Sequence, residues 1–218
     1  MPVENPDKRA RVLDPVERVT EIVFGVLMAL TFTGTLSVAT AGREQVHTMM
    51  LTALGCNLAW GLADAVMYLI QTFTARRRQL ALLMLLRAAG EHARAHQLIV
   101  DALPPLIGAN MERPALERLR QRLLNAPLPE TRLVLRDYAG AFAVFAFVVL
   151  ATFPVVVPFI FVSQTATALR ISNLLAVMTL FFCGQALGHH TSGRPWLYGL
   201  VMTTIGVVLI GIIIALGG

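Results

Sequence analysis

Residues 48–78 read TMMLTALGCNLAWGLADAVMYLIQTFTARRR, an apolar run that ends in three consecutive arginines. Between Thr48 and Phe73 the only charged residue is Asp64. A helix needs roughly 20 mostly apolar residues to cross a bilayer core about 30 Å thick. The stretch therefore predicts a membrane-spanning helix with a basic segment directly after it.

The composition of the whole chain agrees with this reading. Of its 218 residues 56% are hydrophobic and 14% are charged, and the mean hydropathy is +0.67. Soluble domains have about 25% charged residues, so this chain has too few charges to cover its surface in water. Such a composition also excludes disorder, and two distant cysteines exclude a disulfide scaffold. We expect an integral membrane protein.

Four further apolar runs are long enough to span a bilayer, at about residues 19–40, 138–162, 171–187 and 196–216. None shows the alternation of a membrane β-strand. The expected fold is therefore all-α, with five transmembrane helices and a helical insert between the second and the third. The predicted parts are an N-terminal segment (1–18) too long and acidic for a cleaved signal, helices 1–2 (19–73), the insert (74–137) and helices 3–5 (138–218).

The distribution of positive charge predicts the orientation. Sixteen of the eighteen Lys and Arg residues fall on one side of this topology, and only Arg43 and Arg170 fall on the other. Cytoplasmic loops carry the excess of Lys and Arg, so the N-terminus and the insert are expected in the cytoplasm and the C-terminus outside. This topology accounts for the net charge of +5, so no nucleic-acid partner is expected. The expected location is the inner (plasma) membrane of a cell, as a multi-pass protein.

The insert has its own helical pattern. One helix is expected from Arg76 to Leu103, ended by Pro104. A second, over residues 112–125, places its leucines at 116, 119 and 123 along one stripe. A third segment from Pro129 is expected to run into the third span, which makes a small three-helix subdomain. No enzyme motif occurs in the chain, so neither an enzyme nor a tightly bound cofactor is expected.

Polar residues in the first two spans predict a transport pathway. Asp64 lies nine positions from the cytoplasmic end of the second span, about 14 Å deep at 1.5 Å per residue. Met28 has the same depth in the first span, so an antiparallel pair of helices would place the two together. Helical spacing adds Glu21 at the inner mouth and Asn57 beside Thr35 further out. The predicted pathway residues are Asp64, Met28, Asn57, Glu21 and Met67.

These donors suggest a metal cargo. Carboxylate and thioether groups such as Asp64 and Met28 suit a divalent transition metal, because sulfur is a soft ligand. In the insert, Glu91, His92 and His96 form a second predicted metal group, with the histidines one helical turn apart. The alternative is a structural role: methionine as core filling, Asn57 as a link between helices, Asp64 as a paired or protonated carboxyl, and the histidines as solvated surface.

Several stretches resemble the vacuolar iron transporter family and its bacterial relatives. They are EIVFGVLMALTFTGTLSVA (21–39), GCNLAWGLADAVMYLI (55–70), FPVVVPFIF (153–161) and a last helix with Gly199, Gly206 and Gly211. The resemblance implies a homodimer that exports Fe(II) or Mn(II) from the cytosol against protons. The path would line the dimer axis between the first two spans, and carboxylates of the insert would gather the metal.

The sequence departs from that family at one informative position. The family's first span usually carries an aspartate in a G-x-x-D-G setting, and this chain has Met28 there. Asp64 corresponds to the acid of the second span. The alternative function is a non-transporting membrane scaffold whose arginine-rich insert binds a partner or anionic lipid.

Overall fold

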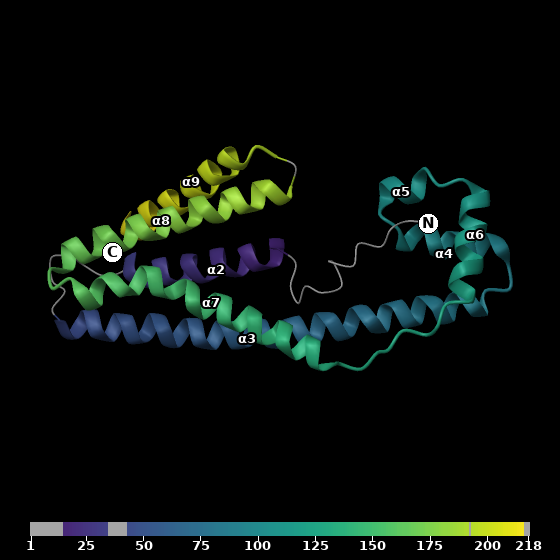
Figure 1. The fold of residues 1–218 in the computed structure, drawn as a ribbon, viewed down its shortest axis with the longest axis horizontal. Coiled ribbons are helices and arrows are strands. Elements are labelled where there is room, and N and C mark those ends of the chain that lie inside the picture. Colours follow the sequence, from purple (N-terminus) through teal and green to yellow (C-terminus); the bar gives the residue numbers. More distant parts are fainter. Residues whose placement is uncertain (1–14, 35–42, 192, 216–218) are drawn as a thin grey trace. The chain divides into compact units, whose positions relative to one another are not determined.

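A computed structural model describes residues 15–34, 43–191 and 193–215 of the chain (Figure 1). All secondary structure in these residues is helical, which confirms the all-α prediction for them. Lys8, Arg9, Arg11 and Thr35, together with the end of the fifth predicted span, lie outside the described residues. The helices are α2 (Pro15–Gly34), α3 (Arg43–Ala88), α4 (His92–Ala102), α5 (Pro105–Ala109), α6 (Arg113–Leu124), α7 (Leu135–Phe161), α8 (Thr165–His190) and α9 (Pro195–Ala215).

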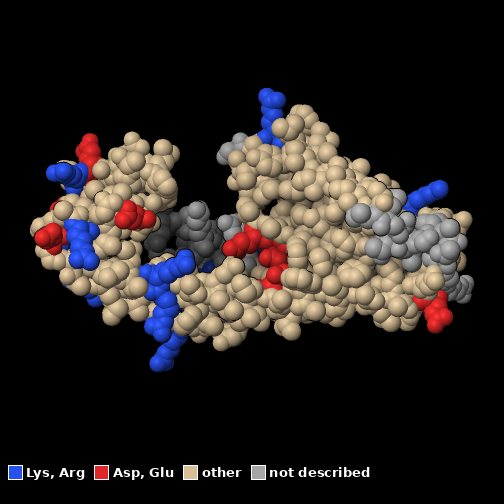
Figure 2. All heavy atoms as spheres, turned by 180° about the vertical axis from the view of Figure 1, so that it is seen from behind, with Lys and Arg blue, Asp and Glu red and all other residues tan. Residues whose placement is uncertain are grey.

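Four helices of the described residues are long and apolar enough to cross a membrane, namely α3, α7, α8 and α9. They match the second to fifth predicted spans. The first predicted span, 19–40, is described only as far as Gly34, where α2 ends. Most of the face shown in Figure 2 belongs to residues other than Lys, Arg, Asp and Glu, and the charged side chains lie in a few groups. The fourth span is longer than predicted, because α8 begins at Thr165, ahead of the apolar run at Ile171.

Helix α3 is much longer than its apolar run. Its 46 residues extend about 69 Å at 1.5 Å per residue, roughly twice the thickness of a bilayer core. The predicted helix over residues 76–103 is wrong, because α3 continues to Ala88 and a new helix starts at His92. The break includes Gly90, whose lack of a side chain favours non-helical backbone.

The predicted helical segment from Pro129 into the third span is also wrong in its first residues. Residues 125–134 are not helical, and α7 begins only at Leu135. Pro127 and Pro129 have no N–H to donate to a helix, and each restricts the residue before it to extended backbone. The short helix α5 follows Pro104, where the sequence predicts a break.

The chain divides into two compact units, one of Met1–Tyr68 with Leu135–Gly218 and one of Leu69–Val134. We call them the apolar unit and the insert unit. The core of the apolar unit lies where α2, α7 and α8 meet, and α9 adds Met202 and Ile210 to it. Small side chains let the helix backbones approach closely. The buried core residues are Val26, Ala29, Leu30, Ala151, Val155, Ala176 and Leu180.

The insert unit has a core of its own, made by α4, α6 and the end of α3. Leu86, Ala95, Ile99 and Leu116 are buried there, and Leu119 and Leu123 pack against them, as the leucine stripe predicts. Arg87 of α3 donates to the carbonyl oxygens of Leu124 and Ala126 at 3.2 and 2.7 Å. Since the last carbonyls of a helix have no partner within it, Arg87 closes the end of α6.

Helices α8 and α9 pack through glycines. A Cβ atom on Gly184 would collide with the carbonyl oxygen of Tyr198 and would lie 2.8 Å from the Cα of Gly199. One turn later, a Cβ on Gly188 would lie 2.6 Å from the Cα of Pro195. The spacing of Gly184 and Gly188 is the small-xxx-small pattern that brings membrane helices together. The two backbones therefore touch with no room for side chains.

We predict that Gly184→Ala destabilises the protein by about 1–3 kcal/mol, because the added methyl group overpacks the α8–α9 contact. Thermal unfolding in detergent micelles measures the effect. Gly211→Ala in α9 is the control, since a Cβ there meets no described atom within 4 Å. Equal melting temperatures for the two variants would contradict this packing.

Candidate functional site

Helices α2 and α3 contact each other through three pairs of residues. Asn57 donates a hydrogen bond to the carbonyl oxygen of Gly25, and the rings of Trp60 and Phe24 meet edge to face with centroids 6.0 Å apart. One turn further along α3, Asp64 lies close enough to Glu21 for the two carboxylates to interact electrostatically. Because the helices run antiparallel, the three pairs follow one another along a single interface.

Asn57 joins three helices. Its side-chain Nδ2 donates to the Gly25 carbonyl of α2 at 3.1 Å and to the Thr152 hydroxyl of α7 at 2.5 Å. Thr152 in turn donates to the carbonyl oxygen of Val148 at 3.3 Å. Asn57 and Thr152 are both fully buried, and burial of an amide among apolar side chains is costly unless it is hydrogen-bonded. This group therefore sets how the three helices pack.

Gly25 allows this contact. A Cβ atom on it would lie 2.5 Å from the carbonyl oxygen of Val148 and 2.9 Å from the Cβ of Ala151. No larger residue fits between α2 and α7 at this level. The sequence singles out Asn57 and Gly25, but Thr152 lies 95 positions from Asn57 and no local pattern identifies it.

The observed register of α2 and α3 differs from the predicted one. The prediction pairs Asn57 with Thr35, whereas Asn57 is bonded to Gly25, ten positions earlier in the chain. Ten positions correspond to about 15 Å along a helix. Asp64 consequently lies beside Glu21, and Met28 lies further along α2, beyond Gly25. The structure does not bring Asp64 and Met28 together.

The two carboxylates are the main acidic feature of this interface. Glu21 and Asp64 are both half-buried, and Glu17, one turn before Glu21, also interacts with Glu21 electrostatically. Carboxylate oxygens bind divalent cations, and the like charges of neighbouring carboxylates disfavour each other until a cation or proton is bound. Met67, the remaining predicted pathway residue, is 48% exposed on α3.

Two aromatic residues beside the carboxylates were not singled out as functional. Phe24 and Trp60 occupy the level between the Glu21–Asp64 pair and the Asn57–Gly25 hydrogen bond. The side chain of Trp60 is 48% exposed. Helical spacing by itself places Trp60 on the face of α3 that carries Asn57 and Asp64.

In the insert unit, the predicted histidines contact a glutamate of α6. The Nε2 atom of His96 lies 2.9 Å from Oε2 of Glu117, and Nδ1 of His92 lies 3.6 Å from the same oxygen. Arg120 donates to both carboxylate oxygens of Glu117, at 2.9 and 2.7 Å. The hydrogen bonds from Arg120 and then from His96 hold the pKa of Glu117 far below its ordinary value.

The third member of the predicted metal group lies apart from this contact. Glu91 is exposed just ahead of α4, and its side chain makes no capping hydrogen bond. Within the described part of the chain, no three His, Cys, Asp or Glu side chains are gathered in a way that could hold a metal ion. Metal binding by Glu91, His92 and His96 stays a prediction, and the observed role of His96 is to join α4 to α6.

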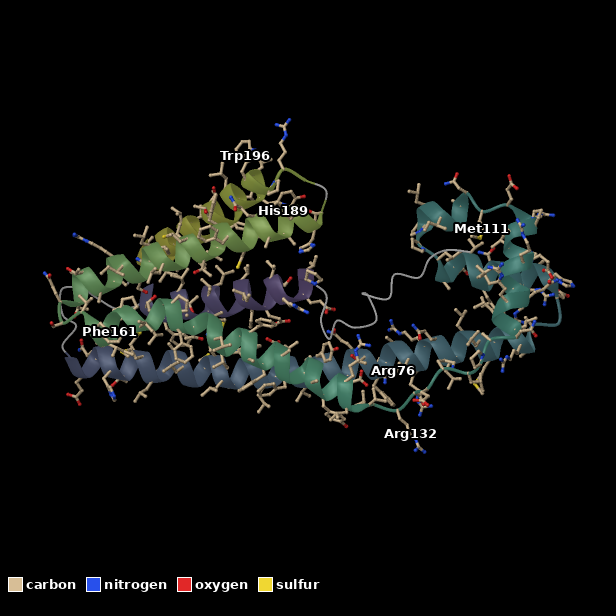
Figure 3. All side chains as sticks on the ribbon, viewed as in Figure 1. Arg76, Met111, Arg132, Phe161, His189 and Trp196 are labelled. Atoms are coloured by element: carbon tan, nitrogen blue, oxygen red, sulfur yellow. The ribbon has the colours of Figure 1, made fainter. Side chains whose placement is uncertain are left out.

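A cavity of about 560 Å³ lies at the other end of the apolar unit, where α3 begins and α7 ends. Polar groups in its wall include His47 and Ser163, and Phe159 and Phe161 supply apolar surface. Figure 3 labels Phe161 at this end of the helices. The cavity was not predicted, because its wall combines residues more than a hundred positions apart.

The chain matches no protein-family model and no curated protein sequence. The resemblance to the vacuolar iron transporter family therefore stays a prediction, based on the layout of spans and on the stretches quoted above.

We predict that Thr152→Val destabilises the protein by about 1 kcal/mol, because it removes the hydroxyl that accepts from Asn57. Thermal unfolding in detergent checks it. Thr204→Val makes the same change on α9, where the hydroxyl is exposed and bonds only to Leu200 of its own helix. A similar loss of stability in both variants would show that Asn57 does not depend on Thr152.

We predict that Glu117→Gln loosens the packing of α4 on α6 at neutral pH. Folding lowers the pKa of Glu117 from its ordinary value of 4.5. The ionised carboxylate therefore stabilises the folded insert unit fully when the pH is above 4.5, and this stabilisation is lost as the pH falls from 4.5 toward the lower pKa of the folded state. Hydrogen exchange of α4 and α6, corrected for the intrinsic effect of pH, should accelerate a few-fold in the wild type at low pH. The variant should be fast at both pH values.

Glu112→Gln is the control, since Glu112 is exposed at the start of α6 and makes no capping hydrogen bond. It should exchange like the wild type. Equal protection of α4 in wild type and Glu117→Gln at pH 7 would overturn the role assigned to Glu117.

Proposed function

We propose that this protein is a secondary transporter that exports a divalent transition metal, Fe(II) or Mn(II), from the cytosol in exchange for protons. The observation that carries the proposal is the pair of carboxylates, Glu21 and Asp64, on neighbouring helices of the apolar unit. Ionisable groups within transmembrane segments are costly and typically mark the path of an ion or a proton.

The chemistry of the pair suits exchange. Two carboxylates supply two negative charges and up to four oxygen ligands, which match the charge of a divalent cation. Neighbouring like charges disfavour each other, so protons can neutralise the pair when no metal is bound. Binding of M²⁺ then releases protons, and return of protons releases the metal. Because the metal and the protons compete for the same carboxylates, metal flux in one direction is coupled to proton flux in the other.

The neighbouring contacts support alternating access at this place. The edge-to-face pair of Phe24 and Trp60 lies at the level between the carboxylates and Asn57, so a cation that moves from the carboxylates toward Asn57 would pass these rings. Asn57 holds α3 against α2 and α7 and provides a fixed point beyond the rings. The proposal includes five spans, a cytoplasmic N-terminus and a homodimer, in line with the resemblance to the vacuolar iron transporter family.

The test is flux of Fe(II) and Mn(II) into proteoliposomes with an imposed proton gradient. We predict that Asp64→Asn and Glu21→Gln each reduce flux to the background of protein-free vesicles, because one carboxylate neither balances the charge of the metal nor exchanges enough protons. Protons should leave the vesicles as the metal enters, so the rise in luminal pH measured in the same vesicles should disappear together with metal flux.

Glu44→Gln is the matched control, because Glu44 is an exposed carboxylate in the first turn of α3. It should transport like the wild type. Metal flux that is absent in the wild type, or that persists in Asp64→Asn, would refute the proposal. The scaffold hypothesis predicts the first of these results.

A further inference from the structure

We propose that the arginines at the end of the apolar run of α3 form a binding site for the headgroups of anionic phospholipids. The site consists of Arg76, Arg77 and Arg78, called here the arginine collar, together with the aromatic ring of Phe73. All four residues belong to one continuous helix, α3. The proposal does not depend on metal transport.

The arginine side chains of the collar extend along α3 toward the apolar run. In an α-helix the Cα–Cβ bonds tilt toward the N-terminus, and long side chains extend that way. The N-terminal direction of α3 leads from the arginines back to Phe73 and Ile70. The contact of Arg77 shows this: its guanidinium carbon lies 5.4 Å from the centre of the Phe73 ring, one turn earlier. The positive charge is thus held at the end of the uncharged apolar stretch that follows Asp64.

A second segment of the insert unit is tied to the collar. Arg76 donates through Nη1 to the carbonyl oxygen of Arg132 at 2.5 Å. The bond draws the segment before α7 against α3 and brings Arg132, whose side chain is exposed, next to the collar, as Figure 3 shows. The site therefore contains cations from two parts of the sequence.

The insert unit contains more arginines than acidic residues. The insert unit, residues 69–134, contains ten arginines and five acidic residues. Arg87 and Arg120 are occupied by the end of α6 and by Glu117. Arg77 and Arg78 are exposed, and neither forms an ion pair with any carboxylate of the described residues. Guanidinium groups bind phosphate oxygens in a two-pronged fashion, so lipid phosphates are suitable partners.

The apolar side of the site favours a lipid over a soluble polyanion. Phe73 is 41% exposed and Ile70 is 50% exposed, directly beside the arginines. A lipid can place its phosphate on the guanidinium groups and its acyl chain against these side chains. A nucleic acid or an acidic peptide would leave the apolar surface uncovered. Clusters of arginine directly beside a membrane helix attract anionic lipids at about 1 kcal/mol per residue.

Native mass spectrometry of the full-length protein in non-ionic detergent tests the site. Phosphatidylglycerol, phosphatidylcholine and inorganic phosphate are each titrated into wild type and into a double variant, Arg77→Gln with Arg78→Gln. We expect phosphatidylglycerol to bind the wild type more tightly than phosphatidylcholine. The double variant should lose about tenfold or more of that affinity. Inorganic phosphate should bind neither protein measurably.

Arg118→Gln with Arg122→Gln is the matched control, because both residues are exposed arginines of α6 in the same unit. This variant loses the same charge and should retain wild-type affinity for phosphatidylglycerol. Three results would overturn the site: no preference for phosphatidylglycerol over phosphatidylcholine, an equal loss in both double variants, or competition by millimolar inorganic phosphate. Thermal unfolding of each variant shows whether a loss of binding reflects a loss of fold.

Discussion

The hydrogen bonds of one buried amide govern the packing of the apolar unit. Asn57 reaches from α3 to the backbone of α2 and to a hydroxyl of α7, and none of these atoms can bond to water instead. Two acceptors satisfy the Nδ2 group of Asn57, whereas its Oδ1 atom has no hydrogen-bond partner among the described residues. A register that also broke the Nδ2 bonds would leave the whole buried amide unsatisfied, which disfavours such a shift of the three helices. Gly25 removes the side chain that would block the approach of α2 to α7.

The carboxylate pair follows from that register. Once Asn57 is beside Gly25, the next turns of two antiparallel helices place Trp60 on Phe24 and Asp64 near Glu21. Apolar packing alone would tolerate a shift of one helix along the other, because leucine and valine side chains are largely interchangeable at such interfaces. The position of the acids therefore depends on a polar contact that lies about 10 Å away along α3.

In the insert unit, apolar packing and arginine contacts act together. Its leucine stripe forms the core, and arginines make the specific contacts: Arg87 at the end of α6, Arg120 on Glu117, and Arg76 on the backbone of Arg132. Helix α3 belongs to both units and continues from one to the other without a break. Figure 2 shows the basic and acidic side chains gathered in a few groups on a surface made mostly of other residues.

The amino-acid sequence by itself determined the helical class, the apolar runs, the leucine stripe and the face of α3 that carries Asn57, Trp60 and Asp64. These features depend on composition and helical period, which are local properties. Only the tertiary structure decided which residues of α2 meet that face, that Thr152 completes the bond of Asn57, and that His96 faces Glu117. Depth counted from the ends of an apolar run misplaced α2 by seven to ten positions, because those ends do not fix where a buried donor finds its acceptor.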